Sequence, residues 1–102
     1  MSAFHERLLK IRDRNRERFR QILEEHVGEV AIFRYDRDSW SAFIGCAVLA
    51  GISTQRIADA VGTEPEVVAL WLDGALPSSR TEQQRRAIEF ITKQMLDPES
   101  AS

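Results

Sequence analysis

The chain has 102 residues, of which 43% are hydrophobic and 29% are charged, an ordinary composition for one compact domain. It carries 14 Lys and Arg residues against 16 Asp and Glu residues, so its formal net charge is -2. This balance excludes a strong overall attraction to nucleic acid, and any contact with phosphate has to come from a local basic patch.

The residues that usually support chemistry are few and scattered. A single cysteine, Cys46, excludes an intramolecular disulfide, and its apolar neighbours indicate a small buried side chain. Neither His5 nor His26 has a cluster of acids or cysteines at ligand spacing around it, so we expect no metal site, no cofactor and no enzyme. Charged residues appear within the first six positions, and no apolar run approaches the roughly 20 residues of a membrane span, so we expect a soluble, cytoplasmic protein that does not contact a membrane.

Residues 1–27 are expected to form one long N-terminal helix, because apolar residues recur there at steps of three and four. The stripe consists of Leu8, Ile11, Asn15, Phe19, Ile22 and His26. Its centre, RDRNRERFR, is polar, which favours a helix that projects from the core or packs against a partner. We expect this helix to supply the contact of a homodimer.

The arginines in this segment, at positions 12, 14, 16, 18 and 20, permit two interpretations. Steps of two residues spread them around a helix, which favours a solvated surface with ion pairs such as Asp13 with Arg16 and Glu17 with Arg20. The alternative is that they bind phosphate or an acidic partner.

Residues 28–38 are expected to be a linker or a short strand. Gly28 stands where a helix C-cap would fall, and the sequence VAIFRY that follows Glu29 is β-branched and aromatic. An extended segment near residues 30–35 would have no second strand in this chain to pair with.

Residues 39–96 are expected to form a four-helix bundle, and residues 97–102 a flexible tail. Asp36, Asp38 or Ser39 can cap the first of these helices, which buries Trp40, Phe43, Ile44, Ala47 and Val48 and stops at Gly51. We expect the remaining helices over residues 54–60, 64–73 and 81–95. Thr63 and Glu66 have the spacing of a capping box, with Pro65 in the first helical turn and Gly74 at the end. The predicted fold class is therefore all-α.

The two short helices over residues 54–73 have the pattern of a motif. A tight turn between helices needs a small residue on the first helix and glycine at the turn, and Ala58 and Gly62 meet both needs. Apolar residues of both helices must face inward, and the candidates are Ile57, Val61, Val68 and Trp71. On this motif, IADAVGTEPEVVALWLDG, residues 40–95 resemble the Cro/C1 (Xre)-type helix-turn-helix DNA-binding domain family, including its closing WLDG. The resemblance implies a compact bundle of four or five helices, usually a homodimer on double-stranded DNA.

The resemblance also implies which residues contact the DNA. The second motif helix would enter the major groove, while the start of the first motif helix and the loop after the second would hold phosphates. The expected phosphate contacts are Thr54, Gln55, Arg56 and Arg80, and the expected base contacts are Thr63, Glu64, Glu66, Val67 and Leu70.

Glu64, Pro65 and Glu66 depart from this pattern, because Arg, Lys, Gln or Asn would be expected on a helix that binds a polyanion. A glutamate can accept a hydrogen bond from the amino group of cytosine, and Val67 or Leu70 could contact a thymine methyl group. Acids in a first helical turn also stabilise the helix itself by roughly 0.3–1 kcal/mol. We expect a small, homodimeric, sequence-specific DNA-binding transcriptional regulator. The alternative is a protein-interaction module that uses residues 64–70 to bind or sequester a partner protein.

Overall fold

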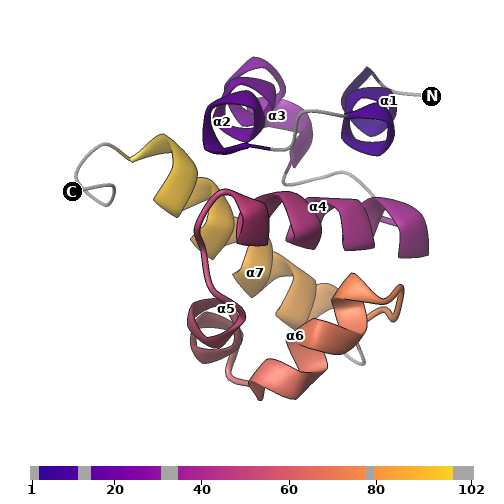
Figure 1. Ribbon diagram of the computed structural model, residues 1–102, viewed down its shortest axis with the longest axis vertical. Coiled ribbons are helices and arrows are strands. Elements are labelled where there is room, and N and C mark those ends of the chain that lie inside the picture. Colours follow the sequence, from indigo (N-terminus) through magenta and orange to yellow (C-terminus); the bar gives the residue numbers. More distant parts are fainter. Residues whose placement is uncertain (1–2, 12–14, 31–34, 78–79, 98–102) are drawn as a thin grey trace.

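In the computed structural model, α4 lies between two groups of helices (Figure 1). Residues 3–11, 15–30, 35–77 and 80–97 are described, except for the side chains of Arg80 and Thr81. They form seven helices and no strand: α1 (Ala3–Lys10), α2 (Arg16–Glu25), α3 (Val27–Val30), α4 (Arg37–Leu49), α5 (Thr54–Val61), α6 (Pro65–Leu72) and α7 (Arg80–Leu96). Helices α1 to α3 lie on one side of α4, and α5 and α6 lie on the other, while α7 contacts both α2 and α5. The Cα radius of gyration is 12.3 Å, as expected for a compact all-helical domain of this length.

The prediction of one long N-terminal helix is wrong, because the segment forms two helices, α1 and α2. Asn15 is the N-cap of α2, where its side-chain oxygen accepts a hydrogen bond from the backbone N–H of Arg18 at 2.8 Å. A polar side chain in the apolar stripe therefore marks the start of a second helix. Arg7 joins the two helices through an ion pair with Glu25, and its guanidinium holds the pKa of that carboxyl below its usual value.

Most apolar side chains of the stripe expected to form a dimer contact are buried inside this chain, whereas Ile11 and His26 are partly exposed and Asn15 is exposed. α1 and α2 both pack against α4, which covers the stripe. The residues fully or almost fully buried are Phe4, Leu8, Phe19, Ile22 and Leu23. Only Leu9 and Val27 of this N-terminal region remain as large exposed apolar side chains among the described residues.

The arginines of α2 that are described make contacts within the chain. The ion pair predicted between Glu17 and Arg20 is present at 3.7 Å, whereas Asp13 lies outside the described residues. Arg16 donates a hydrogen bond to the carbonyl of Ala50, the C-cap of α4, at 3.1 Å. Arg18 donates to the side chain of Gln21 at 3.3 Å. These contacts favour a structural role for this part of the arginine series.

Gly28 is not the C-cap that the sequence suggested. α2 ends at His26, whose backbone N–H donates to Ile22 at 3.1 Å, and Gly28 lies within the short helix α3. Most of the extended segment expected near residues 30–35 lies outside the described residues, but Val30 is helical and buried.

α4 begins at one of the predicted caps and buries four of the five predicted side chains, whereas Val48 is only partly buried. Asp36 accepts a hydrogen bond from the backbone N–H of Ser39 at 2.8 Å, and the Ser39 hydroxyl accepts one from the Asp36 N–H at 2.9 Å. This reciprocal capping box identifies Asp36 as the cap among the three candidates. The helix ends at Ala50, followed by Gly51 with a φ of 104°.

Aromatic rings on α4 hold the two sides of the domain together. Trp40 and Phe43 are stacked at 5.9 Å between ring centroids, and both are fully buried. On one side Phe43 meets Phe19 of α2 edge to face at 5.6 Å, and on the other Trp40 meets Trp71 of α6 at 5.7 Å. Tyr35 packs against both α4 rings, its hydroxyl donates to the carbonyl of Val30, and burial raises its pKa.

Within the described residues, no single helix is long and apolar enough to cross a membrane. α4 and α5 together would meet that test by length and composition, but they are bent by 120° relative to each other. Cys46 is buried on α4, as its apolar neighbours predicted.

We expect Phe43→Ala to lower the free energy of unfolding by about 3–5 kcal/mol, because it leaves a cavity where the two sides of the domain meet. Leu49→Ala on the same helix should change it by no more than about 0.5 kcal/mol, since Leu49 is 59% exposed. Urea denaturation of the two variants measures the difference. Equal losses would contradict the central role of the α4 rings.

Asp36 should make the fold sensitive to acid. The backbone and side-chain hydrogen bonds from Ser39 hold the pKa of Asp36 below its usual value of 3.8. Because this pKa is depressed on folding, the stabilisation is present above pH 3.8 and is lost as the pH falls through the folded-state pKa. Asp36→Ala should lower the free energy of unfolding by about 1 kcal/mol at neutral pH. On acidification, the variant should lose less further stability than the unaltered protein.

Urea denaturation at pH 7 and about pH 3 measures this effect. Asp38→Ala provides the matched control, because Asp38 lies in the first turn of the same helix without serving as its cap. A pH dependence that is the same in both variants would contradict the role of Asp36.

Candidate functional site

The sequence motif corresponds to α5, a turn over residues 62–64, and α6. Each helix has eight residues, and their bounds agree with the predicted ranges to within one residue. α5 ends at Gly62, which has a φ of 86° in the left-handed region that glycine adopts readily. The backbone N–H groups of Gly62 and Thr63 both donate to the carbonyl of Ala58, at 2.8 and 2.9 Å. The chain therefore leaves α5 through a tight hydrogen-bonded turn.

The inward-facing residues of this unit are those that the pattern predicted. α5 and α6 pack against each other, and α5 packs also against α7 and α6 against α4. The apolar side chains buried in these contacts are Ile57, Ala58, Val61, Val68 and Trp71.

The capping box predicted between Thr63 and Glu66 is wrong. The N-cap of α6 is Glu64, which makes no side-chain cap hydrogen bond, and Pro65 occupies the first turn as expected. Thr63 does not take this place because its backbone N–H completes the turn that closes α5.

The residues expected to face DNA bases lie on the outer side of α6 and the turn before it. Glu64, Glu66 and Leu70 are exposed, and Leu70 is exposed by 57%. Thr63 and Val67 are partly exposed. The side chains of the two glutamates make no ion pair or hydrogen bond with any described residue. α6 itself contains no cationic residue, so this surface is acidic and apolar.

Two of the residues expected to hold phosphates, Gln55 and Arg56, make side-chain contacts within the chain. Thr54 and Gln55 lie in the first turn of α5, where the Gln55 amide donates to the Asp59 carboxylate at 2.8 Å. Arg56 turns toward α7, because it donates to Gln94 at 2.6 Å and lies 5.7 Å from the centre of the Phe90 ring. The side chain of Arg80 lies outside the described residues.

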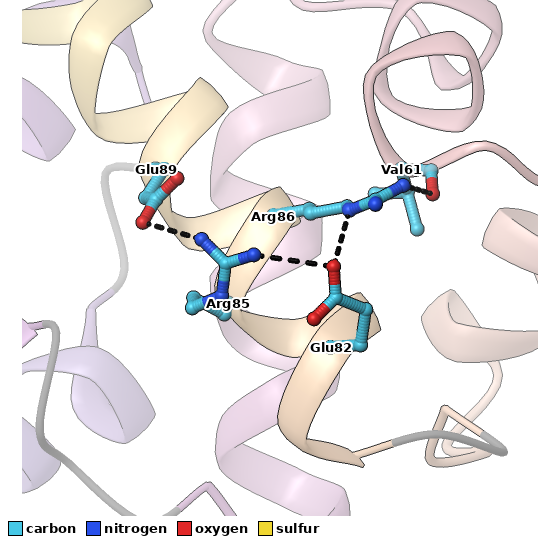
Figure 2. Close-up of polar contacts among 5 residues, drawn as sticks. All are labelled: Val61, Glu82, Arg85, Arg86 and Glu89. Carbon is cyan, nitrogen blue, oxygen red and sulfur yellow. Dashed lines mark hydrogen bonds and ion pairs between the residues drawn. The ribbon is translucent and has the colours of Figure 1, made fainter.

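Sequence reasoning missed a group of charged residues on α7 (Figure 2). Arg85 forms ion pairs with Glu82 at 3.1 Å and with Glu89 at 3.0 Å, and Arg86 pairs with Glu82 at 2.7 Å. Hydrogen bonds from Arg86, together with the charge of Arg85, hold the pKa of the Glu82 carboxyl below its usual value, and Glu89 and Glu82 raise the pKa of Arg85. The spacing of three and four residues in EQQRRAIE indicates these pairs, since such residues are neighbours on a helix.

Arg86 also reaches across to α5, which the sequence did not predict. Its Nη1 donates to the carbonyl of Val61, the last residue of α5, at 3.4 Å (Figure 2). A cation at this end of a helix compensates the partial negative charge of the unpaired carbonyls. Arg86 thus links α7 to the turn between α5 and α6.

α4 supports the opposite end of the unit. The Ser41 hydroxyl donates to the carbonyl of Leu72, the last residue of α6, at 2.7 Å, and Arg37 donates to the carbonyl of Gly74 at 3.0 Å. The C-terminal ends of α5 and α6 are therefore each held by another helix, while the outer surface of α6 remains uncovered by described residues.

In the described part of the chain, no group of three or more His, Cys, Asp and Glu side chains is placed to hold a metal ion. Comparison of the chain with protein-family models, with curated proteins and with solved structures found no match. The family resemblance of residues 40–95 therefore depends on the sequence motif alone.

Gly62→Ala should lower the free energy of unfolding by about 1–2 kcal/mol, because a residue with a Cβ is strained at this positive φ. Steric contact adds little, since the nearest atom to the new Cβ would be Arg86 Nη1 at 3.6 Å. Gly28→Ala is the matched control. It lies in α3 with open space around it, so it should leave stability unchanged or raise it by up to about 1 kcal/mol. Chemical denaturation would contradict this account if both substitutions had the same effect.

Proposed function

We propose that the protein is a small DNA-binding transcriptional regulator in which α5, the turn over residues 62–64 and α6 act as a helix-turn-helix of the Cro/C1 (Xre) type. One observation supports the proposal most: two eight-residue helices are joined by a tight glycine turn, α7 holds the C-terminal end of α5 and α4 holds that of α6, and the outer surface of α6 stays exposed among the described residues. A rigid helix with an open outer surface fits the major groove of B-DNA, which is about 12 Å wide.

In this proposal α6 reads base edges without using a cation. Glu66 accepts from the exocyclic amino group of cytosine, as its carboxylate has no described partner to compete for it. Leu70, one turn further along α6, contacts a thymine methyl group. Thr54 and Gln55, in the first turn of α5, contact the phosphate backbone of the DNA. This contact requires the Gln55 amide to give up its hydrogen bond with Asp59.

The acidic surface of α6 determines how such binding would depend on salt. Glu64 and Glu66 repel nearby phosphates. Because few cationic side chains accompany them to neutralise phosphates, few counterions would be released from the DNA on binding. We therefore expect weak non-specific binding, with affinity for a site that comes mainly from base contacts.

The homodimer in this proposal needs a surface other than the predicted apolar stripe, since most apolar side chains of that stripe are buried within one chain. Two exposed apolar residues, Leu9 and Val27, remain in the N-terminal region to contribute to such a contact. Two-fold symmetry of the bound sequence would support the dimer, because the symmetry of an operator follows that of the protein.

A second candidate is a protein-interaction module that uses residues 64–70. The observation in its favour is that two carboxylates without a partner among the described residues lie at the start of the helix that exposes Leu70 by 57%. An acidic and apolar surface of this kind is complementary to a basic and apolar surface on a partner protein.

Capture of fragmented genomic DNA by the purified protein, followed by sequencing, separates the two candidates. At roughly 50 and 200 mM salt, we expect the DNA-binding protein to enrich the same two-fold symmetric sequence, since phosphate-driven binding falls steeply over this range. Retention that disappears at the higher salt, or no retention, would reject the regulator and favour the protein-interaction module.

Glu66→Gln should change the enriched sequence at one position of each half-site from cytosine towards adenine, because glutamine pairs with adenine and glutamate with cytosine. Glu6→Gln is the matched control, as Glu6 is an exposed acid on α1 and its loss changes the net charge by the same amount. The same capture assay measures both. If the two variants enriched the same sequence, Glu66 would not be a base-reading residue.

A further inference from the structure

A hollow between α5 and α7 has a lining unlike that of the α6 surface. It has a volume of about 380 Å³ and is lined by Ala60, Arg85, Arg86, Glu89, Phe90 and Lys93. Ala60 and Phe90 provide an apolar part, and the remaining residues provide charge. We call this feature the α5/α7 hollow. Its volume lies within the range of about 300–1,000 Å³ that is typical of sites for small molecules.

The α5/α7 hollow is positively charged in a chain whose formal net charge is -2. Its lining contains three cationic side chains, those of Arg85, Arg86 and Lys93, and one anionic side chain, that of Glu89. The lining is therefore net positive by two charges, and by one if Glu82 beyond the rim is included. Arg56, which lies over the Phe90 ring, adds a further cation beside the lining.

The cations of the hollow keep hydrogen-bond donors available for a ligand. Lys93 is exposed, and its side chain makes no ion pair or hydrogen bond with any described residue. Two nitrogens of Arg85 each donate one hydrogen bond to a glutamate, whereas a guanidinium has five N–H donors in total. Glu82 and Glu89 thus hold the guanidinium in position without using all its donors, and its side chain is still 52% exposed.

We propose that the α5/α7 hollow binds a phosphate group, with Lys93 and Arg85 as its principal donors and Ala60 and Phe90 beneath it. Phosphate fits this lining because it carries several acceptor oxygens and matches the planar fork of a guanidinium. The phosphate could belong to a free small molecule or to the backbone of DNA. The first source does not depend on the proposed function, and the second deepens it.

A ligand in this hollow would lie beside the turn of the proposed helix-turn-helix. Arg86 lines the hollow and also donates to the carbonyl of Val61, and its Nη1 would lie 3.6 Å from a Cβ at Gly62. A phosphate that draws Arg86 away from Val61 would remove a support of the last turn of α5. Binding is thus expected to perturb residues 61–63 as well as the lining of the hollow.

The test is a titration of the full chain followed by amide NMR shifts, with inorganic pyrophosphate and a short random-sequence DNA duplex as separate probes. We expect saturable shifts at Ala60, Phe90 and Lys93. Lys93→Gln should weaken binding by about tenfold, the effect of losing one charge-assisted hydrogen bond. Lys10→Gln removes the same charge from the exposed end of α1 and should leave the affinity unchanged.

The two probes distinguish the sources of the phosphate. Shifts with pyrophosphate alone would identify a free ligand, and shifts with the duplex at the same amides would identify the DNA backbone. Either result supports the site, and the pyrophosphate result does so even if no specific DNA sequence is ever retained. No shift in the hollow with either probe, or equal weakening by Lys93→Gln and Lys10→Gln, would overturn the proposal.

Discussion

The stacked rings of Trp40 and Phe43 on α4 are the contact on which the rest of this structure depends. The chain is short, so a single helix has to supply buried surface to both of its sides. Phe43 packs against Phe19 of α2, and Trp40 packs against Trp71 of α6. Since α4 joins the N-terminal helices to the α5–α6 unit, the orientation of the candidate site is set by rings that lie far from its exposed surface.

Arginines provide a second kind of support, because three of them donate to backbone carbonyls at the ends of other helices. Arg16 donates to Ala50 after α4, Arg37 to Gly74 after α6, and Arg86 to Val61 at the end of α5. Each places a positive charge where the last carbonyls of a helix lack partners. These arginines therefore contribute to the packing of short helices, and the cations that remain for binding an anion are fewer than the composition suggests.

The two candidate surfaces differ in charge, and this difference decides what each can recognise. The surface of α6 carries Glu64, Glu66 and the exposed Leu70, which suits the amino group of a base or a basic protein. The α5/α7 hollow is lined by Arg85, Arg86 and Lys93, which suits phosphate. The turn at Gly62 lies between them, so an anion bound in the hollow and a partner bound on α6 would act on the same short segment.

The sequence by itself determined the local features of this protein. The apolar spacing and Gly62 located α5 and α6 to within one residue. The sequence also limited the cap of α4 to three candidates and identified its buried rings, because caps, turns and helical periodicity are encoded by residues close together in the chain. The expectation that Glu64, Glu66 and Leu70 face outward came from the family resemblance, and these residues are exposed.

Only the tertiary structure decided the features that join distant residues. The break before Asn15 was hidden because the apolar stripe continues across it, and the stripe turned out to be covered by α4 of the same chain. The contact of Arg56 with Phe90 and the reach of Arg86 to Val61 connect residues more than 20 positions apart. A long arginine side chain has many partners within reach, and the partner it takes depends on how the helices pack, which local sequence does not specify.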